Sequence, residues 1–427
     1  MDTSNSKNNY EVIIVGAGPA GSTCAILLAK QKRKVLLLDK SVFPRDKICG
    51  DAVSGKSINT IRELGLLEEL SKQEHGVVEG VKLVAPNSNE VVVPFRKANG
   101  LDCAGYCVKR KTTDFLLSKK VKEQKDITFL QGVTVSKLIK NEQDVVIGVE
   151  TQHKDNKQVY YAKIVVGADG SGSVVSREVG NKPNPPQHLY MGVRAYYDNV
   201  DGLEKNIELF FIDDVLPGYL WIFPIGDKKA NVGLGILASD MKKRKIHPNT
   251  LLENAIKNSD KLKKRFSKST RDGNIGAWTI PLGSYKKKLC GDGWVLIGDA
   301  ASLVDPFSGE GFGNATSSAK FCAQTINDVF ANEDEKNKND NNKPDINHLT
   351  CIQLQKYVQE VETKLYPEMD ITYKLQRAAR VNFLLNMFIN KAATKPEFKQ
   401  IVIDMLASNE QKKKVEDPLF YIKLLLP

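Results

Sequence analysis

Glycine residues near the start of the sequence have the spacing of a phosphate-binding turn. Gly16, Gly18 and Gly21 follow an apolar run that predicts a buried strand, and a stretch of small and apolar residues comes after them. The first glycine permits a tight strand-to-helix turn, the second lets the backbone approach a pyrophosphate, and the third permits close packing of the helix. Pro19 and Ala20 lie where that helix begins, and its free N–H groups and dipole favour an anion. This segment predicts a dinucleotide site.

An acidic residue at the end of a second strand supports the same interpretation. The apolar run at 35–38 predicts that strand, and Asp39 ends it where a carboxylate can accept hydrogen bonds from ribose hydroxyls. We include the neighbouring Lys40 in the predicted cofactor site. Glycine spacing of this kind also arises by chance, but the strand, the helix and the acid in register argue against chance. The resulting βαβ unit does not distinguish NAD from FAD.

Two later segments make that distinction. Asp169 and Gly170 follow another strand-like run and predict a turn near the pyrophosphate. An ordinary Asp-Gly turn would explain them if they stood alone. Asp299 follows the strand predicted at 294–297, where its carboxylate can accept hydrogen bonds from a ribityl chain and the pyrophosphate region. The three segments in this order predict FAD held along its full length.

A glycine-rich run after Asp299 is suited to a flat ring. Pro306 opens this run, and Gly309 and Gly311 let the backbone pass beneath a planar group. A helix is predicted to begin near Gly311 and Phe312, and its N-terminus can stabilise negative charge on a reduced flavin. We therefore expect the reactive ring of the cofactor at this point.

Three aromatic residues alternate along one predicted strand. Tyr219, Trp221 and Phe223 share a face of that strand, because successive side chains of a strand point to opposite faces. Such a face forms an apolar wall suited to a long hydrocarbon. The alternative is an ordinary core-facing strand, which the pattern alone does not exclude.

The order of the predicted elements indicates an α/β protein with two interleaved domains. A Rossmann-like FAD-binding domain is predicted from three segments, at 1–75, 109–187 and 286–331. An antiparallel-sheet substrate domain is predicted from 76–108 and 188–285. The polar, low-complexity segment at 332–347 predicts a flexible loop. The remaining segment, 348–427, predicts a helical C-terminal region.

The composition limits the functional classes. The chain has 427 residues, 41% of them hydrophobic, and can bury a full core. We see no signal peptide or membrane-spanning run, and an odd number of cysteines, seven, fits a cytoplasmic protein. The five histidines lie outside the motifs, so no metal site is predicted.

The formal net charge of +11 has two interpretations. The first is a Lys-rich solvated surface. The second is attraction to anionic lipid headgroups, which would make the protein peripheral on the inner membrane face; basic clusters at 242–245, 263–265 and 286–288 would supply it. Nucleic-acid binding is not predicted, because no supporting fold motif or aromatic-interleaved basic stripe accompanies the charge.

The sequence resembles the geranylgeranyl reductase family of flavoproteins, within the para-hydroxybenzoate hydroxylase-type FAD fold. The resemblance covers almost the whole chain. Its specific parts are the segment at 47–52, which contains Cys49 and Gly50, and the PGYxWxFP strand at 217–224. Ordinary aromatic hydroxylases of this fold lack both. The segments that carry it are 16–22, 47–52, 106–110 with Asp114, 168–170, 217–224 and 298–313.

The resemblance implies roles for further residues. It places Cys49 and Gly50, the predicted catalytic pair, beside the flavin together with Ala52. It places the aromatic strand along a polyprenyl pocket. Arg110 matches an arginine that contacts FAD in the family. Val135 matches, more loosely, a backbone contact to adenine.

The resemblance also implies a reaction, in which reduced FAD delivers hydride to one carbon of an isoprenoid alkene. NAD(P)H would bind transiently, or a protein electron donor would replace it, because the chain has no second GxGxxG. Cys49 is then a proton donor, a nucleophile or a buried spacer, since thiol reactivity depends on surroundings that the sequence does not show. Asp39 departs from the family, where Glu is commoner. The exact substrate and the oligomeric state stay open.

Two other functions are consistent with these motifs. A flavin monooxygenase of the same fold would hydroxylate an apolar or aromatic substrate, because the pocket selects the chemistry that a flavin performs. Halogenases of this fold carry a WxWxIP strand, which the stretch at 219–224 does not match. A polyprenyl-binding protein with a vestigial cofactor fold is the other alternative, and the intact glycines with Asp39 and Asp299 argue against it.

Overall fold

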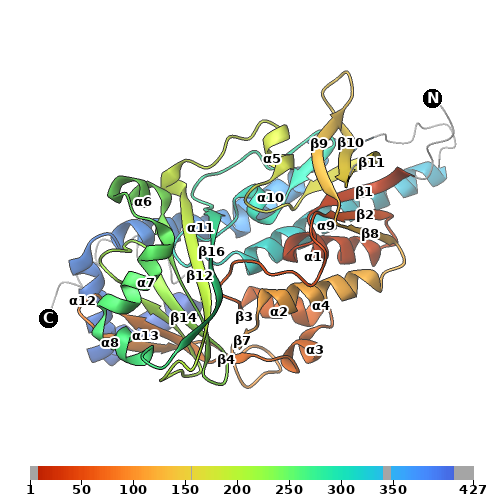
Figure 1. Ribbon diagram of the computed structural model, residues 1–427. Helices are drawn as coiled ribbons and strands as arrows, with labels where there is room; N and C mark the ends of the chain where they lie inside the picture. Colours follow the sequence, from red (N-terminus) through yellow and green to blue (C-terminus); the bar gives the residue numbers. More distant parts are fainter. Residues whose placement is uncertain (1–7, 155, 340–347, 408–427) are drawn as a thin grey trace.

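A computed structural model describes residues 8–154, 156–339 and 348–407. Two large sheets lie side by side along the long dimension of the molecule (Figure 1). One half contains β1, β2 and β8, and the other contains β12, β14 and β16 (Figure 1). No helix of the described part is both long enough and apolar enough to cross a membrane.

The first sheet has eight strands in the described residues, in the order β17-β18-β11-β1-β2-β8, and β10 and β9 continue from β11. The contacts of β1 with β2 and β11, of β2 with β8 and of β11 with β18 are parallel. The strands are β1 (Asn9–Val15), β2 (Val35–Asp39), β8 (Ile127–Gln131), β9 (Thr134–Lys140), β10 (Val146–His153), β11 (Asn156–Gly167), β17 (Cys290–Gly291) and β18 (Trp294–Leu296).

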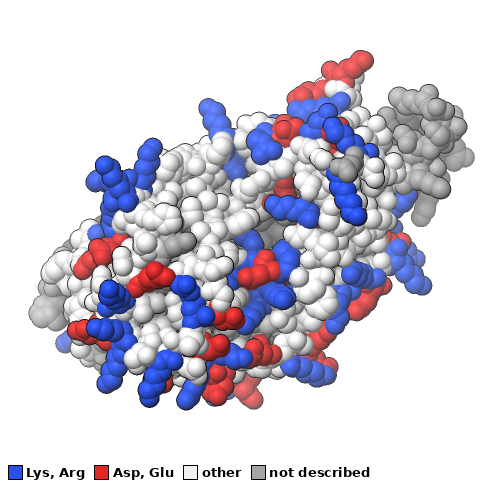
Figure 2. Space-filling model, in the orientation of Figure 1, with Lys and Arg blue, Asp and Glu red and all other residues white. Residues whose placement is uncertain are grey.

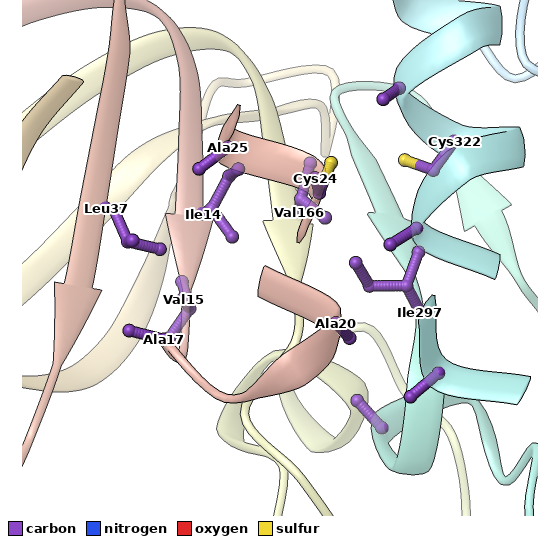
Figure 3. Packing of buried hydrophobic residues seen from close by; sticks show 14 of the residues in the cluster. Ile14, Val15, Ala17, Ala20, Cys24, Ala25, Leu37, Val166, Ile297 and Cys322 are labelled. Atoms are coloured by element: carbon purple, nitrogen blue, oxygen red, sulfur yellow. The ribbon is translucent and has the colours of Figure 1, made fainter. Parts of the chain in front are cut away.

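The central strands of this sheet are buried on both faces, as their continuous apolar sequences require. Helix α1 fills the space between the sheet and α9, and Figure 3 shows Cys24 of α1 between Val166 of β11 and Cys322 of α9. Further helices complete this half. The helices are α1 (Pro19–Ala29), α2 (Lys56–Glu63), α3 (Leu67–Ser71), α4 (Arg110–Lys122), α5 (Val174–Glu178) and α9 (Phe312–Asn339).

Two glycines make the turn after β1 sterically feasible. Gly16 has φ +100°, and a Cβ there would lie 2.4 Å from the carbonyl oxygen of Ala168. A Cβ on Gly21 would lie 1.8 Å from the carbonyl oxygen of Gly16, so α1 can approach the turn only without a side chain. Both positions therefore fulfil the steric roles that the sequence predicts.

The second sheet has seven strands in the described residues, in the order β16-β12-β15-β14-β13-β5-β6. It is antiparallel as predicted, apart from the pair β5 and β13, which are parallel because they come from separate segments of the chain. The strands are β5 (Gly80–Val84), β6 (Glu90–Pro94), β12 (Leu189–Asp198), β13 (Asn206–Phe210), β14 (Tyr219–Gly226), β15 (Lys229–Leu237) and β16 (Thr270–Pro281).

A small third sheet joins the two halves, and its order is β3-β7-β4. Helices α12 and α13 pack on the apolar face of the second sheet near β6 (Figure 1). The remaining elements are β3 (Ala52–Ser54), β4 (Gly76–Val78), β7 (Gly105–Cys107), α6 (Ala238–Arg244), α7 (Pro248–Asn258), α8 (Asp260–Arg265), α10 (Gln355–Lys364), α11 (Tyr366–Ala378), α12 (Asn382–Thr394) and α13 (Pro396–Ala407).

The loop predicted at 332–347 begins later than expected, because α9 continues to Asn339. An ion pair between Arg33 and Asp334, with N and O atoms 2.9 Å apart, ties this end of the helix to the first sheet. The helical segment is thus in contact with the rest of the fold, which its polar composition did not indicate. Residues 340–347, and residues 408–427 of the predicted helical region, lie outside the described part.

Charged residues are distributed over the face seen in Figure 2, with Lys and Arg interleaved with Asp and Glu along its lower edge. Beside the basic cluster at 242–245, Asp240 of α6 pairs with Arg380, which follows α11, at 2.9 Å. The positive charge therefore does not form one continuous stripe on this face.

Candidate active site

A cavity of about 1490 Å³ lies between the two sheets. One part of its wall is the carboxyl edge of the first sheet, where the turn after β1 lies. Another part is the face of the second sheet, from Trp278 on β16 across to Val81 on β5. The third part is formed by α11, α12 and α13.

The cavity brings together nearly all of the residues that the sequence predicts for a site. Every predicted cofactor, catalytic and substrate residue lines it except Gly21 and Pro306. Gly21 is used in packing against the turn. Pro306 is buried, and its carbonyl oxygen accepts a hydrogen bond from Gln376 Nε2 at 2.6 Å. Both residues support the cavity wall, and their predicted role in cofactor binding stays a prediction.

Two predicted acidic residues shape the loops at the edge of the first sheet. The Asp39 carboxylate accepts hydrogen bonds from the Ala17 and Ser41 N–H groups, both at 2.8 Å, and so fixes the glycine turn. The Asp169 carboxylate accepts from Ser173 Oγ and from Val174 N, both at 2.6 Å, at the start of α5. Both carboxylates thus also organise backbone, a role that the sequence analysis did not include.

Cys49 lies in a turn that lines the cavity. Its neighbour Arg110 forms a two-point ion pair with Asp114, with both N–O distances 2.8 Å, and the guanidinium also contacts the Cys49 thiol. Burial disfavours the charge on Arg110, but Asp114 more than compensates and raises the pKa of the guanidinium. A permanent cation therefore lies beside the thiol.

The aromatic side chains predicted on one face of β14 form a continuous wall of the cavity. The ring centroids of Tyr219 and Trp221 are 6.5 Å apart, and those of Trp221 and Phe223 are 6.3 Å apart. The turn with Cys49 lies against this wall, since a Cβ on Gly50 would be 2.7 Å from the Phe223 ring. The turn that contains Cys49 and the aromatic wall are therefore in direct contact.

Comparisons with known proteins agree with this geometry. The family model described as FAD binding domain matches residues 9–332. A digeranylgeranylglycerophospholipid reductase from Methanococcus vannielii is 30% identical over 331 residues, which cover 75% of this chain and 78% of that protein. This chain is a flavoprotein of the geranylgeranyl reductase family. It is an FAD-dependent oxidoreductase.

Other relatives of this flavoprotein have different activities in their names. A menaquinone reductase from Mycobacterium tuberculosis is 28% identical over 324 residues, covering 75% of this chain and 77% of that protein. A 1H-pyrrole-2-carbonyl-[peptidyl-carrier protein] brominase from Pseudoalteromonas luteoviolacea is 28% identical over 336 residues, covering 77% and 80%. The relatives of this chain therefore include both reductases and a brominase.

A solved structure shows the same fold. It is that of a geranylgeranyl bacteriochlorophyll reductase-like protein from Thermoplasma acidophilum, which superposes with a TM-score of 0.78. The match covers 96% of this chain and 99% of that one, at 22% identity. The fold class predicted from the sequence is thereby confirmed.

The residues of this flavoprotein fit FAD. The Asp299 carboxylate faces the cavity, and within the described residues it forms no hydrogen bond, which leaves it free to accept from ribityl hydroxyls. A Cβ on Gly170 would meet nothing within 4 Å, so the backbone there is open to a ligand. Glu310 and Gly311 form the adjoining wall, as expected for the bed of a planar ring.

Several cavity residues of the flavoprotein were not predicted. Lys47 and Asp51 lie in the motif around Cys49, but their types alone did not indicate a role. Asn231 lies behind the cavity wall and has no motif of its own. The apolar residues of the C-terminal helices give only an amphipathic pattern, which is common to core helices. They include Leu375, Ala378, Leu385, Phe388, Ile389 and Val402.

Proposed function

We propose that this flavoprotein reduces carbon–carbon double bonds of a geranylgeranyl or related polyprenyl group. The observation that carries the proposal is the single cavity that joins the glycine-rich cofactor segments to an aromatic and aliphatic chamber. A hydrocarbon chain lying on Trp221 and Phe223 would pass directly over the turn with Cys49. The names of the archaeal and mycobacterial relatives favour the same substrate class.

Reduction of an alkene requires a hydride at one carbon and a proton at the other. Reduced FAD supplies the hydride when it is bound, and NAD(P)H or a protein donor would return the electrons. We propose that the predicted cofactor residues hold FAD, with the adenosine part near Asp39 and Val135 and the ring near Gly309 and Gly311.

We propose that Cys49 donates the proton to the second alkene carbon. Its thiol adjoins the Arg110 guanidinium, and its neighbour Gly50 packs against the aromatic wall. The cation would stabilise the thiolate that remains after the proton has left. Gly50 contributes through its small size, because any side chain there would collide with Phe223. The apolar wall excludes water from the reacting carbons.

An anaerobic assay tests the proposal. The purified holoprotein is reduced with dithionite and mixed with geranylgeranyl compounds, while flavin reoxidation is followed by absorbance and the product by mass spectrometry. Reoxidation with the gain of two hydrogen atoms for each double bond is the expected result. Reoxidation only after oxygen is admitted, with an oxygenated product, would overturn it in favour of a monooxygenase.

Variants at Cys49 test the assignment of the proton. Cys49→Ala and Cys49→Ser should bind FAD normally and lose turnover, because both lack the thiol. The exposed-surface variant Asn258→Asp should retain turnover and serves as the control. Unchanged turnover in both Cys49 variants would remove the thiol from the reaction while leaving the flavin site intact.

A further inference from the structure

A buried amide connects the catalytic turn to the aromatic wall. Asn231 on β15 has no exposed surface, and its side chain forms three hydrogen bonds. Its Nδ2 donates to the Cys49 carbonyl oxygen at 2.6 Å and to Asp51 Oδ2 at 2.7 Å. Its Oδ1 accepts from the Trp221 indole Nε1 at 2.8 Å. All three partners come from elements that line the cavity.

The chemistry of the partners fixes the orientation of this amide. An indole N–H can only donate, whereas a carbonyl oxygen and a carboxylate can only accept. The Asn231 oxygen must therefore face Trp221, and its nitrogen must face the turn that contains Cys49 and Asp51. The reversed amide would place like groups against each other at all three positions. No other orientation satisfies the buried groups.

The same small region shows why the indole can reach the amide. Trp221 lies across β15 at Gly233, where a Cβ would be 2.2 Å from the indole Cζ2 atom. Gly233 and Asn231 are two residues apart and so share one face of the strand. The indole is therefore flat on the strand, and its N–H points along it to Asn231.

We propose that Asn231 is a positioning residue that sets the Cys49 turn in register with Trp221. The amide binds the Cys49 carbonyl group, and Gly50 packs against Phe223, the cross-strand partner of Asn231. The thiol and the surface on which the hydrocarbon rests are thereby fixed relative to each other. The role in double-bond reduction rests on the proposed function, whereas the fixed position of the turn does not.

The substitution Asn231→Asp tests this role with little change in size. Carboxylate oxygens would face the Cys49 carbonyl and the Asp51 carboxylate, so the turn loses its donors when both acids are ionised. A proton shared between the two acids restores one donor at most. Titratable and charged groups around this position are Asp51, Tyr196, Arg194 and Arg110, with the thiols of Cys49 and Cys107.

Alkylation of cysteines measures the position of the turn without any substrate. Cys49 and Cys351 are the two partly exposed cysteines of the described chain, and the other five are buried. Iodoacetamide labelling, read by mass spectrometry, should be roughly tenfold faster at Cys49 in Asn231→Asp, a factor within reach of one buried hydrogen bond. Cys351, far from the amide, should label at the parent rate. The ratio of the Cys49 labelling rate in the variant to that in the parent should grow as pH rises, because the turn loses its donors when both acids are ionised.

Turnover supplies the second measurement. If the proposed reduction occurs, kcat of Asn231→Asp should fall more than KM rises, with FAD content unchanged. If neither parent nor variant reduces a prenyl compound, the proposed function fails, and the labelling ratio alone still decides the role of Asn231. Asn258→Asp controls for the added negative charge.

The outcomes separate a positioning role from a purely structural one. Faster labelling confined to Cys49 supports the proposal. Labelling of Cys49 at the parent rate overturns it, and so does a parallel increase at the buried Cys24, Cys103 and Cys107, which indicates general loosening. Should Asn231→Asp fail to fold, Trp221→Phe removes the indole donor together with part of the ring that packs on β15, and unchanged Cys49 labelling in that variant would overturn the proposal.

Discussion

At the scale of one residue, the burial of the Asp51 carboxyl group predicts how the free energy of unfolding depends on pH. Asp51 is 1% exposed, and burial raises its pKa from 3.8 to about 6, against the opposing effects of Arg194, Asn231 and Tyr196. Because the folded pKa lies above the unfolded one, the fold favours the protonated acid. This contribution to stability is present below about pH 4 and is lost as pH rises through about 6.

Asp51→Asn should remove this pH dependence. Relative to the variant, the parent chain should lose about 3 kcal/mol of unfolding free energy between about pH 4 and pH 7, the equivalent of the shift of roughly two units. Urea denaturation of both proteins across this range measures the difference. Two parallel curves of unfolding free energy against pH would contradict the prediction.

The ammonium group of Lys47 predicts a pH dependence of cofactor binding. Burial lowers its pKa from 10.5 to about 8, although Asp299 acts in the opposite direction. Its Nζ lies 3.8 Å from the centroid of the Trp278 ring, at the cavity wall. The charge that attracts the anionic FAD is therefore lost as pH rises through about 8.

We expect the Kd of FAD to rise between pH 7 and pH 9 in the parent chain and to change less in Lys47→Met. Flavin fluorescence quenching on titration of the apoprotein measures both. The Lys30→Met variant, whose side chain is exposed and lies outside the cavity lining, controls for loss of a positive charge. An equal pH dependence in the parent and in Lys47→Met would exclude this role.

At the scale of the element, the aromatic wall depends on one missing side chain in β15. A Cβ on Gly233 would lie 2.2 Å from Trp221 Cζ2 and 2.3 Å from the Val193 carbonyl oxygen. Gly233→Ala should therefore displace the indole or the strand and destabilise the fold by roughly 1–3 kcal/mol.

Gly235 on the same strand is the matched control, because a Cβ there would meet nothing within 4 Å. Gly235→Ala should leave stability unchanged or raise it by about 0.5–1 kcal/mol, since alanine has less backbone freedom to lose. Urea denaturation followed by tryptophan fluorescence measures both variants. Equal stability of the two would show that the wall adapts to a side chain at position 233.

Elements differ in how far the sequence predicts them. The turn after β1 was predictable because its glycines, strand and helix are adjacent in sequence and have one steric explanation. Asn231 was not predictable, because its partner Cys49 is 182 residues away and an isolated buried amide has no sequence pattern. The extension of α9 was missed for the same reason, since Arg33, which pairs with Asp334, lies in a distant segment.

At the scale of the whole molecule, the cavity unites three parts of the chain. The first sheet supplies the glycine turns, the second supplies the aromatic wall, and the C-terminal helices cover the apolar end. Ion pairs hold the helices in place, among them Arg380 with Asp240 and Lys56 with Glu368. The motifs predicted the first two parts, whereas the third depends on which face of α11 and α12 turns inward, and only the packing decides that.

This arrangement predicts that the C-terminal helices limit the length of the substrate chain that the cavity can bind. Ala378 on α11 lines the apolar end together with Leu385 and Phe388, so Ala378→Trp should shorten the chamber without touching the Cys49 turn. Each buried CH2 contributes about 0.8 kcal/mol, and displacing two carbons should weaken binding roughly tenfold. A geranylgeranyl compound should therefore show a KM about tenfold higher, whereas a geranyl compound, which ends before this point, should be unaffected. Steady-state kinetics with both chain lengths measure the effect, and the short substrate controls for general damage. An equal loss for both lengths would indicate general damage to the site. An unchanged KM for the geranylgeranyl compound would mean that the chain leaves the cavity before it reaches α11.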